Sequence, residues 1–498
     1  MVKIIEIVNQ NPWWSKGEKF VASDLHLSKA KPIFFKRKEL SLEKGNIYIL
    51  RGNRQVGKTT YLKNLIKKLI QKGIPPSNIL YLSVDFFTSR REMRNALNYF
   101  LDSTREAKET YIFLDEITFL EEWNLELKYL VDSGIIKKCV VVATGSSAVK
   151  LKEKGELLPG RGLEGNEYYI KPLSFREFVL QTLDFIVEHI EIEDFRESLV
   201  KLGSVLPNYS INLALNMEQI KKIVFNILPY KKELQYLFRI YLITGGIPGV
   251  VNQYIQSRYK NQKEIINSFL SEIFIRDVLG DLSRLQRQEV IIREILKAII
   301  ERYGSRYSFL KLSQGIERTH VTIIDSLRIL ENSFILHVLF AYDFNKKYIK
   351  LKGDKKVYFL DPFIYNSVKS YLSGREIWDI ITETLRDEEI QSKLVEGIVI
   401  SHLLMHKEIP YLREGETFLW NYYDKSGKEI DAIIKVNEKY LGIEVKYQTR
   451  VDERDIKKIS PIKNYILLSK EDVGGKNNTI IVPVDVFLSL LPVSERNI

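Results

Sequence analysis

The sequence is short of cysteine and of long apolar runs, and both shortages exclude classes of protein. A single cysteine, Cys139, occurs among 498 residues, so a disulfide framework and a metal site built from several cysteines are excluded. The first residues carry charge where a secretory signal peptide needs a long apolar core. No apolar stretch approaches the length of a transmembrane helix. We therefore expect a soluble, cytoplasmic protein with no membrane partner.

The charge and the apolar content of the chain indicate which classes of protein remain. Lys and Arg number 75 against 64 Asp and Glu, a formal net charge of +11, which favours a polyanionic partner such as nucleic acid or an acidic membrane surface. The excess is mild for a chain of this length. Hydrophobic residues make up 45% of the chain, enough for several packed cores, and the length is typical of about three or four domains.

The segment Gly52–Thr59 has the G-x-x-x-x-G-K-T spacing of a phosphate-binding loop. The apolar run Ile47–Leu50 before it predicts a buried strand, and apolar residues at helical spacing follow from Tyr61 to Leu69. Strand, loop and helix is the context that this motif requires. The alternative is an ordinary glycine-rich turn between a strand and a helix. Such a turn would not require all the residues of the motif together with the apolar segments on both sides.

The residue types of this loop suit a nucleoside triphosphate. Gly52 and Gly57 let the backbone curl so that its N–H groups face phosphate oxygens, and the helix that opens at Lys58 adds the positive end of its dipole. We expect Lys58 to reach the β- and γ-phosphates and the Thr59 hydroxyl to bind Mg²⁺, with ATP as the nucleotide. The nucleotide-contacting residues would be Gly52, Asn53, Arg54, Gln55, Val56, Gly57, Lys58, Thr59 and Thr60.

A second nucleotide signature is the apolar run Tyr111–Leu114, which is followed by Asp115 and Glu116. Asp115 is expected to hold Mg²⁺ through the water shell of the ion. Glu116 is expected to polarise the attacking water as a general base. A strand that merely ends in two acidic residues is the alternative, which the upstream phosphate loop disfavours.

Further polar residues follow the apolar run Val140–Ala143. In a parallel sheet the carboxyl ends of the strands line the ligand crevice, so a hydroxyl such as that of Ser146 could sense the γ-phosphate and orient the water. The neighbouring Ser147 could equally cap a helix. Arg161 lies in a glycine-flanked turn and could reach phosphates in its own subunit or in a neighbouring subunit of a homo-oligomer. A solvated loop position is the equal alternative for Arg161.

Five segments in chain order resemble the archaeal-type AAA ATPases, a P-loop family related to the signalling NTPases. They are Arg54–Thr60, Phe113–Ile117, Ala143–Ser147, Gly160-Arg161 and Pro172–Phe178, of which the last is specific to that family. The resemblance implies an α/β fold: a parallel-sheet P-loop NTPase domain with a helical lid, a winged helix and a C-terminal α/β restriction-nuclease-like domain. The expected domains are residues 1–180 (ATPase), 181–287 (lid with an insertion at 181–235), 288–365 (winged helix) and 366–498 (nuclease-like).

The run Thr244–Gly249 interrupts the expected helices of the lid with glycines and a proline. In ATPases of the resembled family a glycine-proline turn in the lid touches the nucleotide, which would bring Gly246 and Pro248 near the adenine. A turn that merely breaks a helix is the equal alternative.

Residues 288–365 have the pattern of a winged helix: three amphipathic helical segments, then two strand-like runs that flank a basic loop. Such a domain places its third helix in the major groove of DNA and its wing on the phosphates. The side chains expected to face DNA are Arg318, His320 and Thr322. The wing lysines are Lys346, Lys347, Lys350, Lys352, Lys355 and Lys356. Winged helices also dock proteins, and lysine-rich hairpins are commonly just solvated, so these alternatives stay open beside DNA.

An apolar hairpin, Glu429–Val436 and Tyr440–Lys446, carries polar residues that resemble a PD-(D/E)xK nuclease core. Strand alternation sends Glu444 and Lys446 to one face, where Asp431 can join them. In this interpretation Asp431 and Glu444 bind Mg²⁺, which polarises the phosphate. Lys446 positions water or stabilises the developing charge, and Glu396 adds a carboxylate ligand. A surface hairpin with cross-strand ion pairs is the alternative.

Two histidines, His402 and His406, fall at i, i+4 on a predicted helix, but no glutamate follows the first. Packing or solvent exposure is therefore a better interpretation than zinc binding. Taken together, the patterns favour a multidomain ATPase that acts on DNA, in which ATP hydrolysis controls a Mg²⁺-dependent nuclease-like domain. The alternative is a nucleotide-driven signalling or scaffold switch whose C-terminal domain binds DNA or protein without cutting. A plain metabolic P-loop enzyme is the poorest option, because no substrate-pocket motif is evident.

Overall fold

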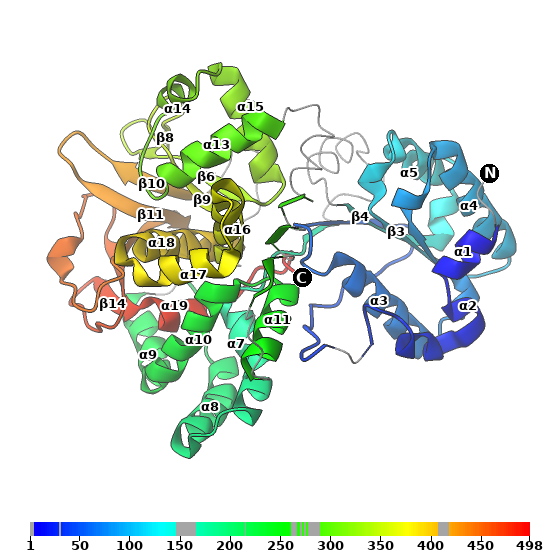
Figure 1. Ribbon diagram of the computed structural model, residues 1–498, viewed down its shortest axis with the longest axis horizontal. Helices are drawn as coiled ribbons and strands as arrows, with labels where there is room; N and C mark the ends of the chain where they lie inside the picture. The colour runs from blue at the N-terminus through cyan, green and yellow to red at the C-terminus, as the bar shows by residue number, and fades with distance from the viewer. Residues whose placement is uncertain are drawn as a thin grey trace. The chain divides into compact units, whose positions relative to one another are not determined.

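The computed structural model describes residues 4–28, 31–145, 166–214, 216–259, 266–268, 271–272, 275–276, 289–406 and 418–498. The chain forms two compact units. The first comprises Met1–Lys171 together with Arg496–Ile498, and the second comprises Pro172–Glu495. Figure 1 shows the main part of the first unit in blue to cyan and the second in green to red.

The first unit is built on a five-stranded sheet in the order β2-β3-β4-β1-β5, and every neighbouring pair is parallel. Its strands are β1 Ile47–Arg51, β2 Ile79–Ser83, β3 Thr110–Asp115, β4 Cys139–Gly145 and β5 Glu167–Tyr169. Alternate residues of β1 belong to two separate hydrophobic clusters, one on each face of the sheet. A sheet covered on both faces needs continuous apolar runs, which explains why the sequence shows no alternation here.

Helices supply the two clusters that cover this sheet. On one face lies α3 Lys58–Gln71, with Trp13 of the short helix α2 Trp13–Lys16. On the other face lie α4 Arg90–Ser103 and α5 Trp123–Asp132, joined by α1 Ile4–Gln10. Trp13 and Trp14 anchor the N-terminal segment to the sheet, because their indole N–H groups donate to the Ile79 carbonyl at 3.0 and 2.8 Å.

The second unit begins with a helical region. Its helices are α7 Phe175–Glu188, α8 Glu193–Val205, α9 Met217–Ile227, α10 Lys231–Thr244 and α11 Pro248–Tyr259. The run at 172–178 forms the start of α7, where Ser174 and Glu177 make a reciprocal capping box. Among the described residues, no single helix is long and apolar enough to cross a membrane. The two helical segments Met217–Thr244 and Pro248–Tyr259, which meet at a bend of 115°, would be long and apolar enough only if they are counted together.

Three helices and two small sheets follow. The helices are α13 Glu289–Glu301, α14 Phe309–Gly315 and α15 His320–Asn332, and Thr319 caps α15 by accepting from the Thr322 N–H at 3.2 Å. Strand β6 Leu336–Leu339 pairs antiparallel with β9 Lys356–Phe359. Between them, β7 Tyr342–Asp343 and β8 Tyr348–Ile349 form a short hairpin.

The C-terminal region has a mixed five-stranded sheet in the order β10-β11-β12-β13-β14. The strands are β10 Leu419–Tyr423, β11 Glu429–Val436, β12 Lys439–Val445, β13 Asn464–Ser469 and β14 Thr479–Pro483, and the helices are α16 Pro362–Ser373, α17 Ile377–Arg386, α18 Glu388–Met405 and α19 Val484–Leu490. The first two pairings are antiparallel and the last two are parallel. Between β12 and β13 the expected helical segment is only a 3₁₀ turn, Glu453–Asp455.

Candidate functional site

The phosphate loop joins β1 to α3 and has the backbone shape that its glycines permit. Gly57 has φ 96° and Gln55 has φ 62°, both in the left-handed region. A Cβ atom on Gly52 would lie 2.0 Å from the Ile170 carbonyl oxygen, so only glycine fits there. The side chain of Lys58 is buried and donates to the carbonyls of Gly52 and Asn53 at 3.1 and 2.8 Å. The lysine thus lies over its own loop.

Asp115, at the end of β3, accepts hydrogen bonds from hydroxyl groups on three other elements. It accepts hydrogen bonds from Thr59 at the start of α3, at 2.7 Å, and from Tyr81 on β2, at 2.8 Å. It also accepts one from Thr144 on β4. Asp115 is only 2% exposed, so these donors replace the water that its carboxylate loses. The direct bond between Thr59 and Asp115 joins the two predicted Mg²⁺-binding residues.

Two residues of this constellation, Tyr81 and Thr144, were not predicted from the sequence as site residues. Thr144 stands next to the last residue of β4, where ligand crevices form, and that position is the signal that could have identified it. Tyr81 lies in the middle of β2 and gives no such signal. Burial, followed by the charge of Asp115, raises the pKa of Tyr81 well above its usual value. The Tyr81 hydroxyl therefore stays protonated and donates.

Glu116 follows Asp115 in a left-handed conformation, with φ 53°. A glutamate rarely adopts this conformation, and residues that do so often belong to functional sites. Its backbone N–H donates to the Thr144 hydroxyl at 3.3 Å, which ties the residue to the end of β4. Its role as a general base stays a prediction.

The remaining predicted nucleotide contacts are not tested by the described residues. Ser146, Ser147 and Arg161 lie in the segment 146–165, outside those residues. Pro248 lies in the second unit, whereas the phosphate loop lies in the first. Their nucleotide contacts stay predictions.

The turn Gly245-Gly246 has a structural role that the geometry makes clear. A Cβ on Gly246 would lie 2.1 Å from the Leu173 carbonyl oxygen, and a Cβ on Gly245 would overlap the Asp361 carboxylate. The Gly246 N–H donates to Asp361 Oδ2 at 2.7 Å, and its carbonyl accepts from the Leu173 N–H at 2.8 Å. The two glycines thus let three distant segments of the second unit meet.

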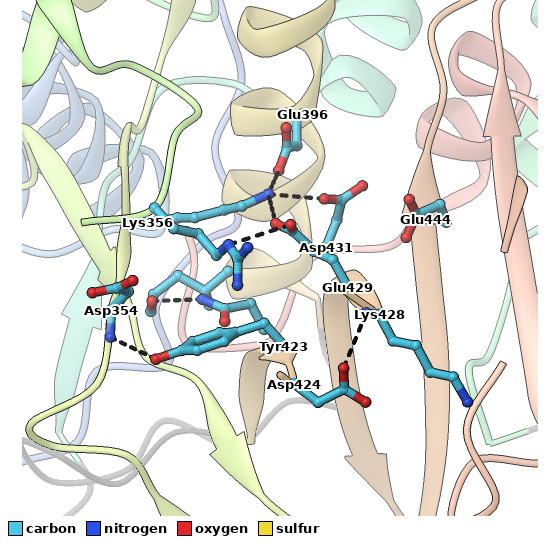
Figure 2. A network of polar contacts seen from close by, with 12 residues as sticks. Asp354, Lys356, Glu396, Tyr423, Asp424, Lys428, Glu429, Asp431 and Glu444 are labelled. Atoms are coloured by element: carbon cyan, nitrogen blue, oxygen red, sulfur yellow. Dashed lines mark hydrogen bonds and ion pairs between the residues drawn. The ribbon is translucent and has the colours of Figure 1, made fainter. Parts of the chain in front are cut away.

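A second polar site lies where β9, α18 and β11 meet (Figure 2). Figure 2 shows the Lys356 ammonium group between three carboxylates. Lys356 Nζ lies 2.7 Å from Glu396 Oε1, 2.9 Å from Glu429 Oε1 and 2.9 Å from Asp431 Oδ1. The Tyr358 hydroxyl also donates to Glu396. Lys356 is 4% exposed and Asp431 is 6% exposed, so the charges compensate one another away from water.

The predicted nuclease-like residues do come together at this site. Asp431 Oδ2 accepts from the Val445 N–H at 3.0 Å, which places the Asp431 carboxylate beside β12. Lys446 Nζ lies 2.9 Å from Glu444 Oε1. The second oxygen of the Glu444 carboxylate, Oε2, is buried and has no hydrogen-bond partner among the described residues.

This arrangement does not fit the expected metal ion. Within the described part of the chain, no group of three or more His, Cys, Asp or Glu side chains is placed to hold a metal. The physical reason is the Lys356 ammonium, which separates Glu396 from Asp431 and takes an oxygen atom of each. The sequence placed Lys356 among the lysines of a wing expected to contact DNA phosphates, and so gave no sign of its part in this site.

Burial and mutual charge set the protonation of the cluster. Burial, then the charge of Asp431, raises the pKa of Glu396 to about 7 and that of Glu444 to about 8. Burial is the largest influence on Asp431 and would raise its pKa, but Lys356, the Val445 N–H and Lys446 together outweigh it and hold that pKa below its usual value. Burial alone would lower the pKa of Lys356, yet the surrounding carboxylates, Asp431 foremost, hold it well above its usual value. Lys356 and Asp431 thus form a charged pair.

The basic loop divides into exposed and buried lysines. Lys346, Lys347 and Lys352 are exposed, whereas Lys355 and Lys356 are buried, which corrects the expectation that all six lysines form one basic cluster on the wing. Lys350 Nζ donates to the Tyr423 carbonyl of β10 at 2.8 Å.

The β7–β8 hairpin packs on the C-terminal sheet. The Tyr342 ring lies 4.6 Å from that of Trp420 on β10 and 5.7 Å from that of Tyr440 on β12. The Phe344 ring lies 5.0 Å from the Tyr440 ring. The base of the predicted wing is therefore held by aromatic contacts, and only its tip faces solvent.

Two further predicted groups have clear surroundings. Arg318 binds both carboxylate oxygens of Glu294 at 2.9 and 3.1 Å, and His320 is exposed at the start of α15. His402 is buried and accepts from the Phe175 N–H through Nε2 at 2.7 Å, so its proton lies on Nδ1 and donates to the Ile398 carbonyl at 2.7 Å. This histidine packs and does not bind zinc, as the sequence predicted.

Three family models match parts of the chain. Residues 44–179 match an AAA domain, residues 235–374 match a domain of unknown function (DUF8612) and residues 391–487 match another (DUF4143). The AAA match agrees with the parallel sheet and the phosphate loop described above. The first unit therefore contains an AAA-type, ATPase-like domain with a nucleotide-binding fold.

Relatives and solved structures add little on activity. The chain is 24% identical over 472 residues to an uncharacterized protein of Methanocaldococcus jannaschii, MJ1637, covering 91% of this chain and 87% of the relative. An uncharacterized protein of Haemophilus influenzae is 26% identical over 346 residues, covering 66% and 70%. Two solved structures are similar at lower identity. AMPPCP-bound DnaA from Aquifex aeolicus is 15% identical, with 66% of this chain and 89% of that chain covered and a TM-score of 0.22. C. elegans PCH-2 is 12% identical, with 48% of this chain and 61% of that chain covered and a TM-score of 0.25. TM-scores this low carry no argument about this chain.

Proposed function

We propose that the protein is an ATP-driven switch that acts on DNA through its second unit. The observation that carries the ATP part is the hydrogen bond between Thr59 and Asp115, which brings the phosphate loop and the end of β3 together. In this proposal Lys58 exchanges its loop carbonyls for phosphate oxygens when ATP binds. Thr59 and Asp115 would hold Mg²⁺, which neutralises phosphate charge. Glu116 would orient and deprotonate the attacking water.

Phosphate release from ATP by the full chain tests this proposal. Lys58→Ala should abolish turnover, because Lys58 is the motif residue that reaches the β- and γ-phosphates. The control is Lys137→Ala, which removes an exposed lysine of the same unit. Equal turnover by Lys58→Ala and wild type would contradict the proposal.

For the second unit we favour the version of the switch that binds DNA without cutting it. The observation that favours it over cleavage is the position of Lys356 among the carboxylates that a nuclease would use for metal. The three helices α13 to α15 and the exposed lysines at the hairpin tip are our candidates for DNA contact. Tip lysines on phosphates would release counterions, so binding should weaken steeply as salt rises.

Binding to duplex DNA over a salt series tests this second part. The double variant Lys346→Ala/Lys347→Ala should bind more weakly and with a smaller salt slope, by about one to two units for two lost phosphate contacts. The matched control is Lys137→Ala/Lys138→Ala, which removes two exposed lysines from the first unit. Absence of DNA binding by the wild type would instead favour a protein partner for the second unit.

A further inference from the structure

The side chain of Lys356 is surrounded in the way that a bound cation would be. Its ammonium group has three N–H donors, and Glu396, Glu429 and Asp431 each supply one acceptor oxygen within 2.9 Å. Two of these donors make hydrogen bonds, to Glu396 and Asp431, and Glu429 forms an ion pair with the same ammonium group. Lys356 is one of the most buried lysines of the described residues, at 4% exposure.

We propose that Lys356 is the resident cation of this carboxylate site, and that the site binds no divalent metal while Lys356 is in place. The inference rests on the nuclease-like character proposed for the C-terminal sheet and deepens it. It assigns the metal position of that fold to an ammonium group of the chain itself. The consequence is a site with nuclease-like residues and no metal.

Distances and charge explain why the lysine and a metal exclude each other. Mg²⁺ holds its oxygen ligands at about 2.0–2.1 Å, whereas the carboxylate oxygens stand 2.7–2.9 Å from Lys356 Nζ. A metal would have to draw the same oxygens inward while a positive charge remained between them. In a buried site, like charges at such separations repel strongly.

The Lys356 side chain is fixed by the segment that carries it. Its backbone belongs to β9, which pairs with β6 along Lys356–Phe359. Tyr358, two residues on, donates to Glu396, and Arg306 lies 3.3 Å from Glu429. The segment that precedes α16 therefore supplies three groups to this one cluster.

One acceptor of the cluster lies beyond the reach of Lys356. Glu444 Oε2 is buried without a hydrogen-bond partner among the described residues, while Oε1 pairs with Lys446. Glu444 itself is 4% exposed. A buried and unsatisfied carboxylate oxygen is costly and indicates a position made for a cation or donor. Removal of the Lys356 ammonium would leave Glu396, Glu429 and Asp431 without the cation that they share.

Binding of Mn²⁺ to the full chain without nucleotide or DNA tests the proposal, by calorimetry and by the loss of free Mn²⁺ signal in electron paramagnetic resonance. Wild type should bind no Mn²⁺ at this site. Lys356→Met should gain one site, with affinity higher by roughly tenfold or more than any wild-type binding. Lys356→Met/Asp431→Asn should lose the gained site. Lys355→Met is the matched control, because the neighbouring Lys355 is also buried but donates to the carbonyls of Leu351 and Gly353.

Two results would overturn the proposal. One is a Mn²⁺ site in wild type that Asp431→Asn removes, and the other is a folded Lys356→Met that gains no site. If Lys356→Met is unfolded at room temperature, refolding it in the presence of Mn²⁺ tests the proposal instead. Mn²⁺ should raise the melting temperature of Lys356→Met and leave that of wild type unchanged. If Mn²⁺ does not restore the folding of Lys356→Met, the proposal fails. Because the assay contains no ATP, its failure leaves the ATPase proposal standing, and loss of ATP turnover does not affect this result.

Discussion

At the scale of single residues, both polar sites depend on buried carboxylates whose water has been replaced by protein donors. Asp115 has three hydroxyl donors, and Asp431 has an ammonium group and a backbone N–H. Neutral donors leave Asp115 free to exchange them for a metal and its water. The charged donor at Asp431 neutralises the carboxylate in place. The two sites therefore differ in how readily they would accept a cation.

The first prediction concerns Thr144. Thr144→Val keeps the shape of the side chain but removes a donor from a buried carboxylate, so the free energy of unfolding should fall by roughly 1.5–3 kcal/mol. Thr104→Val removes a hydroxyl that donates to the neutral Phe100 carbonyl and should cost only about 0.5–1.5 kcal/mol. Urea unfolding of both variants makes the comparison. Equal losses would show that the charge of Asp115 does not strengthen the Thr144 bond.

The second prediction concerns pH and His402. Burial lowers the pKa of His402 to about 4, whereas in the unfolded chain it titrates near its ordinary value of about 6.5. The unfolded chain therefore binds the proton first, and stability is lost as the pH falls from about 6.5 to about 4. Relative to His402→Gln, which does not titrate, wild type should lose up to about 3 kcal/mol over this range. Urea unfolding at pH 7, 5.5 and 4 measures the difference, and a constant difference would contradict the assigned pKa.

At the scale of elements, the sequence predicted β1, β3, β4 and α3 of the first unit, because continuous apolar runs and the phosphate loop are local signals. The helices α4 and α5 and the strand β5 were not predicted. The hairpin β11–β12 was predicted for the same reason, and its turn at Asn437 and Glu438 has the positive φ values of a tight hairpin turn. The expected helix before β13 was not found beyond Glu453–Asp455. The contacts between helices and strands that are distant in the sequence were the hardest to predict.

Lys355 and Lys356 show why docking could not be predicted. In the sequence they end a series of lysines and look alike. In β9 and just before it, successive side chains point in opposite directions, so Lys355 lies over the Phe309 ring at 4.4 Å while Lys356 meets carboxylates 40 and 75 residues away. A single sequence gives no sign of partners so distant. The same holds for Tyr81 and Thr144, which reach Asp115 only because three strands are parallel neighbours or near-neighbours.

The third prediction tests the close packing at the α10–α11 turn. Gly246→Ala should lower the melting temperature of the second unit markedly, because its Cβ would meet the Leu173 backbone at 2.1 Å. Gly249→Ala, in the first turn of α11, has nothing within 4 Å of the new Cβ. It should be neutral or stabilising by up to about 1 kcal/mol through helix propensity. Calorimetric melting of the two variants compares them, and similar melting would contradict the role assigned to the turn.

At the scale of the whole molecule, the chain leaves the first unit after Lys171 and returns to it at Arg496. The return is built into β5, since the Tyr169 N–H donates to the Arg496 carbonyl at 2.7 Å and the Ile498 N–H donates to the Tyr169 carbonyl at 2.9 Å. Ile498 is 2% exposed within the same cluster as α3. Residues far apart in sequence thus complete the sheet that carries the phosphate loop.

The fourth prediction follows from this return. Ile498→Ala should lower the free energy of unfolding of the first unit by roughly 2–4 kcal/mol, as for other buried isoleucines cut to alanine. Ile498→Val should cost only about 0.5–1.5 kcal/mol. Urea unfolding followed by hydrogen exchange of amides in the first unit reports on this unit. No loss in the alanine variant would show that the last residues do not belong to its core.

The double crossing has a consequence for how the chain could be cut. The second unit is joined to the first at both of its ends, after Lys171 and before Arg496. A single break in the backbone of the second unit would therefore leave each of the two fragments covalently joined to the first unit.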